Sequence, residues 1–422
     1  MFALVDVNSF YASCEKVFRP DINDKPIIVL SNNDGCVIAR NNEAKRLGIK
    51  MGHPYFKIPL NFIKQHDIQV FSSNYALYAD MSNRVMETLE MLTPRIEVYS
   101  IDEAFCQLPS SMNHLPLELQ GKIIRNTIKQ YTHLTVGVGI APTKTLAKLA
   151  NYAAKKWPQT NGVVDLSDIR RQHKLMTITP VSEVWGVGKK LHKQFNAMNI
   201  YTAMDLARLS PHQIRKKFNI IVERTVRELN GEPCLSLEET IESRKQIICS
   251  RSFGEKVTQF NIMREAICNY TARAAEKLRS DQLYCQHITI FIKTSPFNKV
   301  TPYYSNYGSK ALMPTNDTRK LLASAQKILS KIWLEGEQYQ KAGVILNNFC
   351  SNKTKQFDMF SNYTMQLKNE KLMKTIDKIN NSHNCKLFFA SQGVKGQWHM
   401  KQQFLSPAYT TQIKDIANVK IT

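Results

Sequence analysis

The order of predicted strands and helices indicates an α+β protein built from several modules. Residues 1–165 mix short apolar strands with amphipathic helices, whereas residues 166–232 show only short helices. Residues 247–349 have the order strand, helix, strand, strand, helix, strand, which is typical of a ferredoxin-like βαββαβ module. The chain has 422 residues, a length that accommodates roughly three ordinary domains.

The element boundaries in residues 1–165 follow from capping and turn residues. Ser9 precedes an apolar period and is predicted to cap a helix that runs to Phe18. Gly48 ends a second helix, and Pro94 follows the end of a third. The expected strands are residues 2–7, 26–30, 36–39, 95–99, 104–108 and 135–141. The later expected helices are residues 42–47, 74–92, 117–131 and 143–155.

Boundaries are less sharply marked in the rest of the chain. In the βαββαβ module the expected helices are residues 262–278 and 317–333, and the strands after the first are residues 286–293, about 300–305, and 343–349. Residues 232–243 are polar and contain four Glu, so residues 233–246 are predicted to be a linker. The last seventy residues are rich in Asn and Lys and weakly periodic, which predicts a tail with local structure at most.

The charge distribution favours a polyanionic partner. The chain has 57 Lys and Arg against 35 Asp and Glu, a net charge of +22. Residues 1–165 carry 18 basic and 15 acidic side chains, whereas residues 166–422 carry 39 and 20. A nearly neutral front part followed by basic modules is typical of a catalytic domain joined to domains that bind a phosphate backbone. A basic surface kept for solubility is the alternative, and an anionic membrane fits less well because no basic amphipathic helix is evident.

Several features exclude other classes of protein. No apolar stretch approaches the roughly 20 residues of a membrane helix. The start of the chain lacks the basic and apolar regions of a signal peptide. The nine cysteines include no CxxC pair, which argues against a zinc ribbon or a disulfide framework. We therefore expect a cytoplasmic protein.

Three acidic residues lie where apolar strands end, namely Asp6, Asp102 and Glu103. A carboxylate in a buried strand is costly unless a positive group pairs with it. No Lys or Arg is adjacent to any of the three in sequence, so a bound divalent metal is the expected partner. Two Mg²⁺ ions can activate an attacking hydroxyl and stabilise a leaving pyrophosphate. Taken singly, Asp6 could instead be a cap, and Asp102 and Glu103 could lie in a solvated turn.

Three ordered motifs resemble those of the Y-family DNA polymerases. They are ALVDVNSFYASCE at residues 3–15, YSIDEAF at residues 99–105 and GVGIAPTKTLAK at residues 137–148. Residues 34–45, DGCVIARNNEAK, are most similar to the UmuC branch of this family. Asn8 and Asn42 stand where other branches often have Asp and Tyr, which also fits the UmuC branch.

The resemblance implies a right-hand polymerase fold. Its regions would be a ferredoxin-like palm at residues 1–18 and 71–165, small fingers at 19–70, a helical thumb with a helix–hairpin–helix at 166–232, the linker, a little finger at 247–350 and a C-terminal tail at 351–422. The implied activity is error-prone, template-directed insertion of deoxynucleotides opposite damaged bases in the SOS response. No unassigned acidic block is large enough for an exonuclease domain, so we expect no proofreading. A nucleotidyl cyclase with a similar palm and a non-catalytic DNA-binding scaffold are the alternatives.

The resemblance also assigns roles around the acidic residues. Asp6, Asp102 and Glu103, with the carbonyl of Val7, would hold two Mg²⁺ ions as the catalytic centre. Tyr11 would exclude a ribose 2′-hydroxyl, and Phe10 beside it would contact the nucleotide or belong to the core. Lys45 and Lys155 would contact the triphosphate, where cations offset the charge that builds during phosphoryl transfer.

The basic modules supply candidate DNA contacts. Gly186 and Gly188, followed by Lys189, would offer backbone N–H groups to phosphates from the turn of a helix–hairpin–helix. Arg251 lies on a predicted little-finger strand similar to the family's DNA-contacting strand, and it could also be an ordinary edge-strand arginine. Such contacts position a duplex without reading its sequence, so binding should weaken with salt.

The tail contains candidate partner sites. Residues 356–360 resemble the pentapeptide that docks into the bacterial sliding clamp, and they are Gln356, Phe357, Asp358, Met359 and Phe360. Such a tether raises the effective concentration of a polymerase at the primer end. LSPAYTTQ at residues 405–412 resembles the UmuC C-terminus, although Ile413 stands where Trp is common. The family implies a processed UmuD-type dimer and a recombinase filament as further partners.

Overall fold

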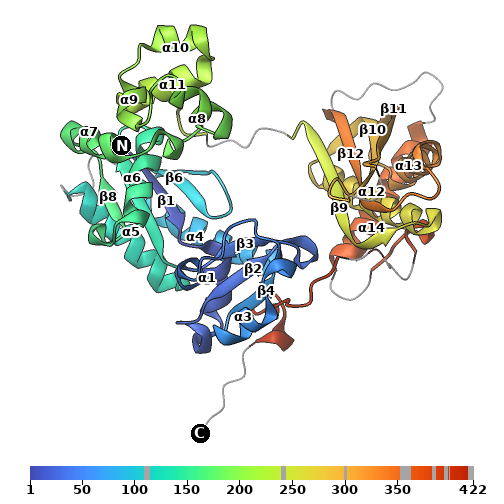
Figure 1. The fold of residues 1–422 in the computed structure, drawn as a ribbon. Coiled ribbons are helices and arrows are strands. Elements are labelled where there is room, and N and C mark those ends of the chain that lie inside the picture. Colours follow the sequence, from blue (N-terminus) through green and yellow to red (C-terminus); the bar gives the residue numbers. More distant parts are fainter. Residues whose placement is uncertain are drawn as a thin grey trace. The chain divides into compact units, whose positions relative to one another are not determined.

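The chain divides into two compact units in the computed structural model (Figure 1). The first comprises Met1–Ile241 and Phe404–Thr422, and the second comprises Glu242–Gln403. The structure describes residues 1–108, 115–238, 244–298, 302–351, 363–382, 386–393, 398 and 400–416. The chain leaves the first unit within the stretch expected to be a linker and returns to it at Phe404, near its end.

A five-stranded sheet forms the centre of the first unit. Its strands are β5 (Arg95–Val98), β6 (Glu103–Gln107), β1 (Phe2–Val7), β7 (Val136–Ala141) and β8 (Val163–Asp165), in this order across the sheet. β1 runs antiparallel to both of its neighbours. The central position of β1 places its C-terminal end, with Asp6, between β6 and β7.

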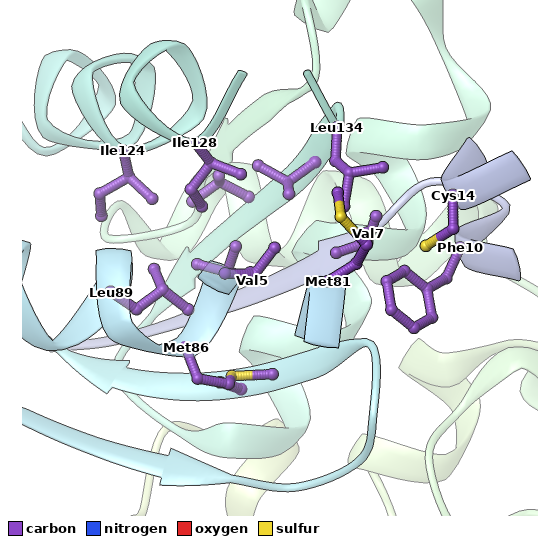
Figure 2. Close-up of a cluster of buried hydrophobic side chains, with 14 of the residues drawn as sticks. Val5, Val7, Phe10, Cys14, Met81, Met86, Leu89, Ile124, Ile128 and Leu134 are labelled. Carbon is purple, nitrogen blue, oxygen red and sulfur yellow. The ribbon is translucent and has the colours of Figure 1, made fainter. Parts of the chain in front are cut away.

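Alternate residues of β1 enter two different cores. Val5 and Val7 pack against α4 (Tyr75–Leu92) and α5 (Leu117–Thr132), as Figure 2 shows for Met81, Leu89 and Ile124. Leu4 points to the opposite face of the sheet, where α6 (Lys144–Lys156) covers it. Since Asp6 has the same parity as Leu4, its side chain lies on the α6 face.

A smaller sheet with its own core carries the predicted fingers residues. It contains β3 (Val37–Arg40), β2 (Ile27–Leu30) and β4 (Gln69–Ser72), in this order. β2 pairs antiparallel with β3 and parallel with β4. α1 (Phe10–Val17) follows β1, and the short helices α2 (Asn42–Arg46) and α3 (Leu60–Gln65) accompany the small sheet. β4 and α3 lie in a stretch for which the sequence predicted no element.

Short helices alone make up the described part of residues 166–232, as predicted. They are α7 (Ile169–Ile178), α8 (Lys189–Asn196), α9 (Ala203–Ala207), α10 (Pro211–Lys217) and α11 (Ile220–Leu229). They share a core with α6. The buried carboxylate of Glu228 in α11 accepts hydrogen bonds from the backbone N–H and the hydroxyl of Thr145, at 2.9 and 2.6 Å. This contact ties the helical region to the start of α6.

The second unit has the predicted βαββαβ order. Its elements are β9 (Gln246–Val257), α12 (Phe260–Ser280), β10 (Leu283–Thr294), β11 (Ser305–Thr315), α13 (Thr318–Ile332) and β12 (Tyr339–Ser351). The strand order is β11-β10-β12-β9, and both helices share one core with one face of the sheet. The strand expected at about 300–305 was wrong, because β11 begins where that segment ends. β11 is a mostly exposed edge strand, so it lacks the apolar alternation that marks a buried one.

The expectation of a tail with only local structure was also wrong. α14 (Tyr363–Asn381) is a long helix packed within the second unit. Its Met373 is 1% exposed, and its Asp377 receives two hydrogen bonds from Arg279 of α12, at 2.6 and 2.7 Å. Beyond it, residues 404–416 pack on the first unit. Among the described residues, no helix combines the length and apolarity needed to span a membrane.

Candidate active site

The three predicted carboxylates meet at one end of β1. The register of the antiparallel pair sets Asp6 directly opposite Glu103, so both side chains leave the same face of the sheet. Asp102 immediately precedes β6, and its carbonyl accepts a hydrogen bond from the N–H of Val7 at 2.8 Å. Residues separated by almost a hundred positions are thereby brought together by strand pairing.

A cavity of about 380 Å³ opens beside this strand end. Its walls come from the end of β1, α1, β3, α2 and α6. Among its lining residues are most of those predicted from the sequence to act here, namely Asp6, Val7, Phe10, Tyr11, Lys45, Asp102 and Lys155. Glu103 is not among the lining residues. The sequence assigned no role in a site to the remaining ones, Ser9, Ile38, Ala39, Arg40, Met51 and Ile101.

Lysines of α6 pair with two of the carboxylates. Lys155 forms an ion pair with Asp6, and the ammonium of Lys148 lies 3.0 Å from both carboxylate oxygens of Glu103. The expectation that no cation lies beside the acids was therefore wrong. It considered only neighbours in sequence, whereas α6 packs across the sheet and presents residues seven apart on the same side. Glu103 is held in this ion pair rather than presented to the cavity.

Burial makes the charge of Asp6 costly. Desolvation raises the pKa of Asp6, the ion pair with Lys155 opposes this, and the nearby Asp102 and Glu103 raise the pKa further. The cation at hand therefore only partly compensates the local negative charge. Among the described residues, no group of three or more His, Cys, Asp or Glu side chains is already arranged to hold a metal. The donors are nonetheless all oxygens around a buried negative charge, which suits a hard divalent cation.

Aromatic rings line the cavity on the side of α1. Tyr11 stacks on Tyr78 of α4, with ring centroids 4.4 Å apart and planes 14° from parallel. Phe10 is 4% exposed and belongs to the core, although it also borders the cavity. Ser9 does not cap α1 as predicted, because its backbone is left-handed, with φ of 48°, and its side chain makes no cap hydrogen bond. Its hydroxyl instead lies 3.4 Å from the ammonium of Lys45.

Arg40, Lys45 and Lys155 also line the cavity, and Lys155 is the residue paired with Asp6. Partial burial lowers the pKa of Lys45, and the nearby charges of Arg40 and Lys155 lower it further. Arg40 donates to the carbonyl of Ile49, and its buried Nε has no hydrogen-bond partner among the described residues. Arg40 was missed from the sequence, where the available signal was a charge at the end of the apolar strand VIAR. The cavity is thus lined by both carboxylates and cations.

The sequence matches known families over most of its length. Residues 5–152 match the impB/mucB/samB family, and residues 244–359 match its C-terminal domain. Protein UmuC of Salmonella typhimurium strain LT2 is 55% identical, with 100% of each chain covered. The chain belongs to the impB/mucB/samB family. Residues 370–419 of this family member match a domain of unknown function.

More distant comparisons agree with this assignment. DNA polymerase IV of Clostridium acetobutylicum is 27% identical to this impB/mucB/samB family member over 92% of the chain and 96% of that protein. A solved Y-family DNA polymerase chimera, Dbh-Dpo4(243-245)-Dbh, has the same fold. It has a TM-score of 0.64 and 21% identity and covers 83% of this chain and 100% of that one. The predicted membership in the Y family, in its UmuC-like branch, and the predicted enzyme class of DNA polymerase are confirmed. Members of this family use divalent metal ions.

The predicted helix–hairpin–helix turn of this family member lies between α7 and α8. Gly186, Gly188 and Lys189 are exposed, and α8 begins at Lys189. Only Gly186 has a backbone conformation that demands glycine, with φ of 89°. Gly188 is extended, and a Cβ there would meet no described atom within 4 Å, so within the protein only Gly186 requires glycine. Trp185 donates to the hydroxyl of Tyr99 at 3.3 Å, which fixes the turn to the large sheet.

Arg251 of this family member lies on β9, an edge strand of the second unit. Its guanidinium donates to the carbonyl of Ser250 at 2.9 Å. Together with Arg273 and Lys277 of α12 it lines a second cavity, of about 600 Å³. The clamp-motif residues Gln356, Phe357, Asp358, Met359 and Phe360 lie outside the described residues.

Proposed function

We propose that this chain is an error-prone DNA polymerase that inserts deoxynucleotides opposite damaged template bases, in the SOS response, without proofreading. The observation that carries the proposal is the single cavity lined by Asp6 and Asp102 together with Arg40, Lys45 and Lys155. Carboxylates and several cations in one cavity suit an incoming nucleotide triphosphate with its metal ions.

The carboxylates are proposed as the metal-binding side. Asp6, Asp102, Glu103 and the carbonyl of Val7 would hold two Mg²⁺ ions, which activate the primer 3′-hydroxyl and stabilise the leaving pyrophosphate. The buried, incompletely compensated charge of Asp6 supports this role. Glu103 forms an ion pair with the ammonium of Lys148 in this structure. Glu103 must therefore release Lys148 before it can bind a metal ion.

The cations and the aromatic rings would place the nucleotide. Lys45, Lys155 and Arg40 are proposed to neutralise the triphosphate. Burial lowers the pKa of Lys45, and the nearby charges of Arg40 and Lys155 lower it further, so a bound anion would stabilise its ammonium. Tyr11 is proposed to close the pocket against a ribose 2′-hydroxyl. Its stacking on Tyr78 holds the Tyr11 ring in one orientation. A fixed ring is needed if Tyr11 is to exclude a sugar with a 2′-hydroxyl by steric clash.

DNA and protein partners would bind outside this pocket. Gly186, Gly188 and Lys189 are proposed to contact phosphates of the primer–template, as is Arg251 beside its cationic cavity. The sliding clamp would bind residues 356–360, and a processed UmuD-type dimer and a recombinase filament are further proposed partners. The site of action would be the cytoplasm.

Primer extension by the purified full-length chain tests the proposal. The assay uses Mg²⁺, dNTPs and a labelled primer on an undamaged template and on one with an abasic site, each with and without the UmuD-type dimer. We expect extension past the lesion, with no shortening of a mismatched primer. A nucleotidyl cyclase would consume nucleotide and leave primer length unchanged. A non-catalytic scaffold would bind the DNA and consume none. Either result would overturn the proposal.

A further inference from the structure

The segment Phe404–Ile416, here called the brace, packs against the small sheet of the first unit. The carbonyl of Phe404 accepts from the N–H of Ser72 at 2.9 Å, and the N–H of Phe404 donates to the Ser72 hydroxyl at 3.0 Å. The Phe404 ring meets Tyr55 edge-on at 5.6 Å and packs on the core of the small sheet. The brace is therefore attached to the end of β4.

The brace also contacts the helices of the large sheet. The side-chain amide of Asn74 donates to the Ser406 hydroxyl at 2.9 Å, while its oxygen caps α4 through the N–H of Leu77. The ring of Tyr409 stacks on Phe18 at 4.7 Å, with planes 7° apart. Because Ser72 ends β4 and α4 begins at Tyr75, the brace covers the joint between the two sheets.

A buried hydrogen-bonded chain leads from the brace to the nucleotide pocket. Glu15 of α1 is 0% exposed, and its Oε1 accepts from the Ser406 hydroxyl at 3.2 Å and from the Tyr78 hydroxyl at 2.6 Å. Tyr78 in turn stacks on Tyr11. Ser406 and Tyr78 thus donate to the same oxygen of one buried carboxyl group, whose Oε2 has no hydrogen-bond partner among the described residues.

We propose that the brace fixes the small sheet to the large one, and that Glu15 and Ser406 are positioning residues that hold Tyr11 through Tyr78. This assigns a role to part of the region that matches a domain of unknown function. The effect on sugar selection rests on the proposed function. The mechanical role of the brace does not, because it follows from contacts within the first unit.

Hydrogen exchange on the full-length chain tests the mechanical role. Ser406→Ala removes the bridging hydroxyl, and Tyr409→Ala removes the ring stacked on Phe18. Leu405→Ala and Ile413→Ala are matched controls, because these side chains are 50% and 89% exposed in the same segment. We expect amide exchange in residues 72–78 to rise about tenfold in Ser406→Ala, equivalent to about 1.4 kcal/mol, and to stay unchanged in the controls.

Unchanged amide exchange in Ser406→Ala would overturn the proposed mechanical role of the brace. If Tyr409→Ala does not fold, the exchange measured in Ser406→Ala alone tests the mechanical role of the brace. A second readout is the ratio of ribonucleotide to deoxyribonucleotide insertion, which should rise in Ser406→Ala but not in Leu405→Ala. Faster exchange with an unchanged ratio would overturn the positioning of Tyr11. Absence of insertion by the wild-type chain would instead count against the proposed function, and exchange would still decide the brace.

Discussion

The ammonium of Lys148 lies 3.0 Å from both carboxylate oxygens of Glu103 and 4.3 Å from the centre of the Tyr99 ring. This pair is mostly buried, and seven residues further along α6 Lys155 pairs with Asp6. Two acids proposed to bind metal are thus each held by a lysine of one helix. The lysines neutralise the carboxylates and would compete with metal ions for them.

Lys148→Met should therefore make stability depend more strongly on Mg²⁺. Removing the ammonium leaves Glu103 buried without its cation, which lowers the melting temperature in EDTA. Added Mg²⁺ should restore more of that loss than it gains in the wild type, because the ion replaces the ammonium. Thermal unfolding with and without Mg²⁺ measures this, with Lys156→Met, an exposed lysine of the same helix, as control. An equal response to Mg²⁺ in variant and wild type would contradict the competition.

Tyr11→Ala should admit ribonucleotides. Without the ring, the pocket wall against the sugar is lost while the carboxylates and cations remain. Single-nucleotide insertion with paired rNTP and dNTP substrates measures the preference. Tyr131→Ala, an exposed tyrosine on α5, is the control. An unchanged sugar preference in Tyr11→Ala would count against its role.

Glu15 should make the stability of the chain fall as pH rises. Burial raises its pKa from 4.5 to about 7, against the hydrogen bonds from Tyr78 and Ser406. The folded chain then binds a proton that the unfolded chain has released between pH 4.5 and about 7, so the free energy of unfolding decreases through this window. Glu15→Gln should remove a decrease of up to about 3 kcal/mol.

Urea unfolding at about pH 5 and about pH 8 measures this difference. Glu90→Gln, an exposed acid on α4, is the control and should leave the pH dependence unchanged. The ionisable neighbours Cys14, Tyr78 and Tyr409 also face Glu15, and burial raises the pKa of each of them. They stay neutral through this window. If Glu15→Gln keeps the full pH dependence of the wild type, the decrease has another source.

Replacing Gln356 and Phe360 together with Ala should weaken synthesis that depends on the sliding clamp and spare synthesis without it. The pentapeptide is proposed to act as a tether, so its loss lowers the local concentration at the primer end and leaves the cavity unaltered. Primer extension with and without loaded clamp separates the two. Equal loss in both assays would indicate misfolding instead.

The regular elements could be predicted where local periodicity reports burial. The side chains of β1 alternate between two cores, and Asn74 caps α4. Both elements were therefore located from the sequence almost to the residue. The edge strand β11 was predicted at the wrong place in the sequence because few of its side chains are buried. The carboxylates were found because motifs mark them. Their pairing with Lys148 and Lys155 depends on how α6 crosses the sheet, which no local pattern contains.

The brace escaped prediction for a related reason. Its anchors Phe404, Ser406 and Tyr409 are separated in a polar segment and show no helix or strand period. They are ordered by partners hundreds of residues away, such as Glu15 and Asn74. Isolated apolar residues in a polar terminal segment are thus only a weak indication, in the sequence, that the segment packs against the rest of the protein.

Single-nucleotide insertion opposite an abasic site by Asp102→Asn tests the central claim most directly. The substitution keeps the size of the side chain and removes the charge of one of the two carboxylates that line the cavity. We predict a loss of at least about a hundredfold in kcat, with DNA binding unchanged. The control Asp24→Asn alters an exposed acid and should insert at the wild-type rate. Insertion by Asp102→Asn at the wild-type rate would contradict the assignment of this cavity as the polymerase site.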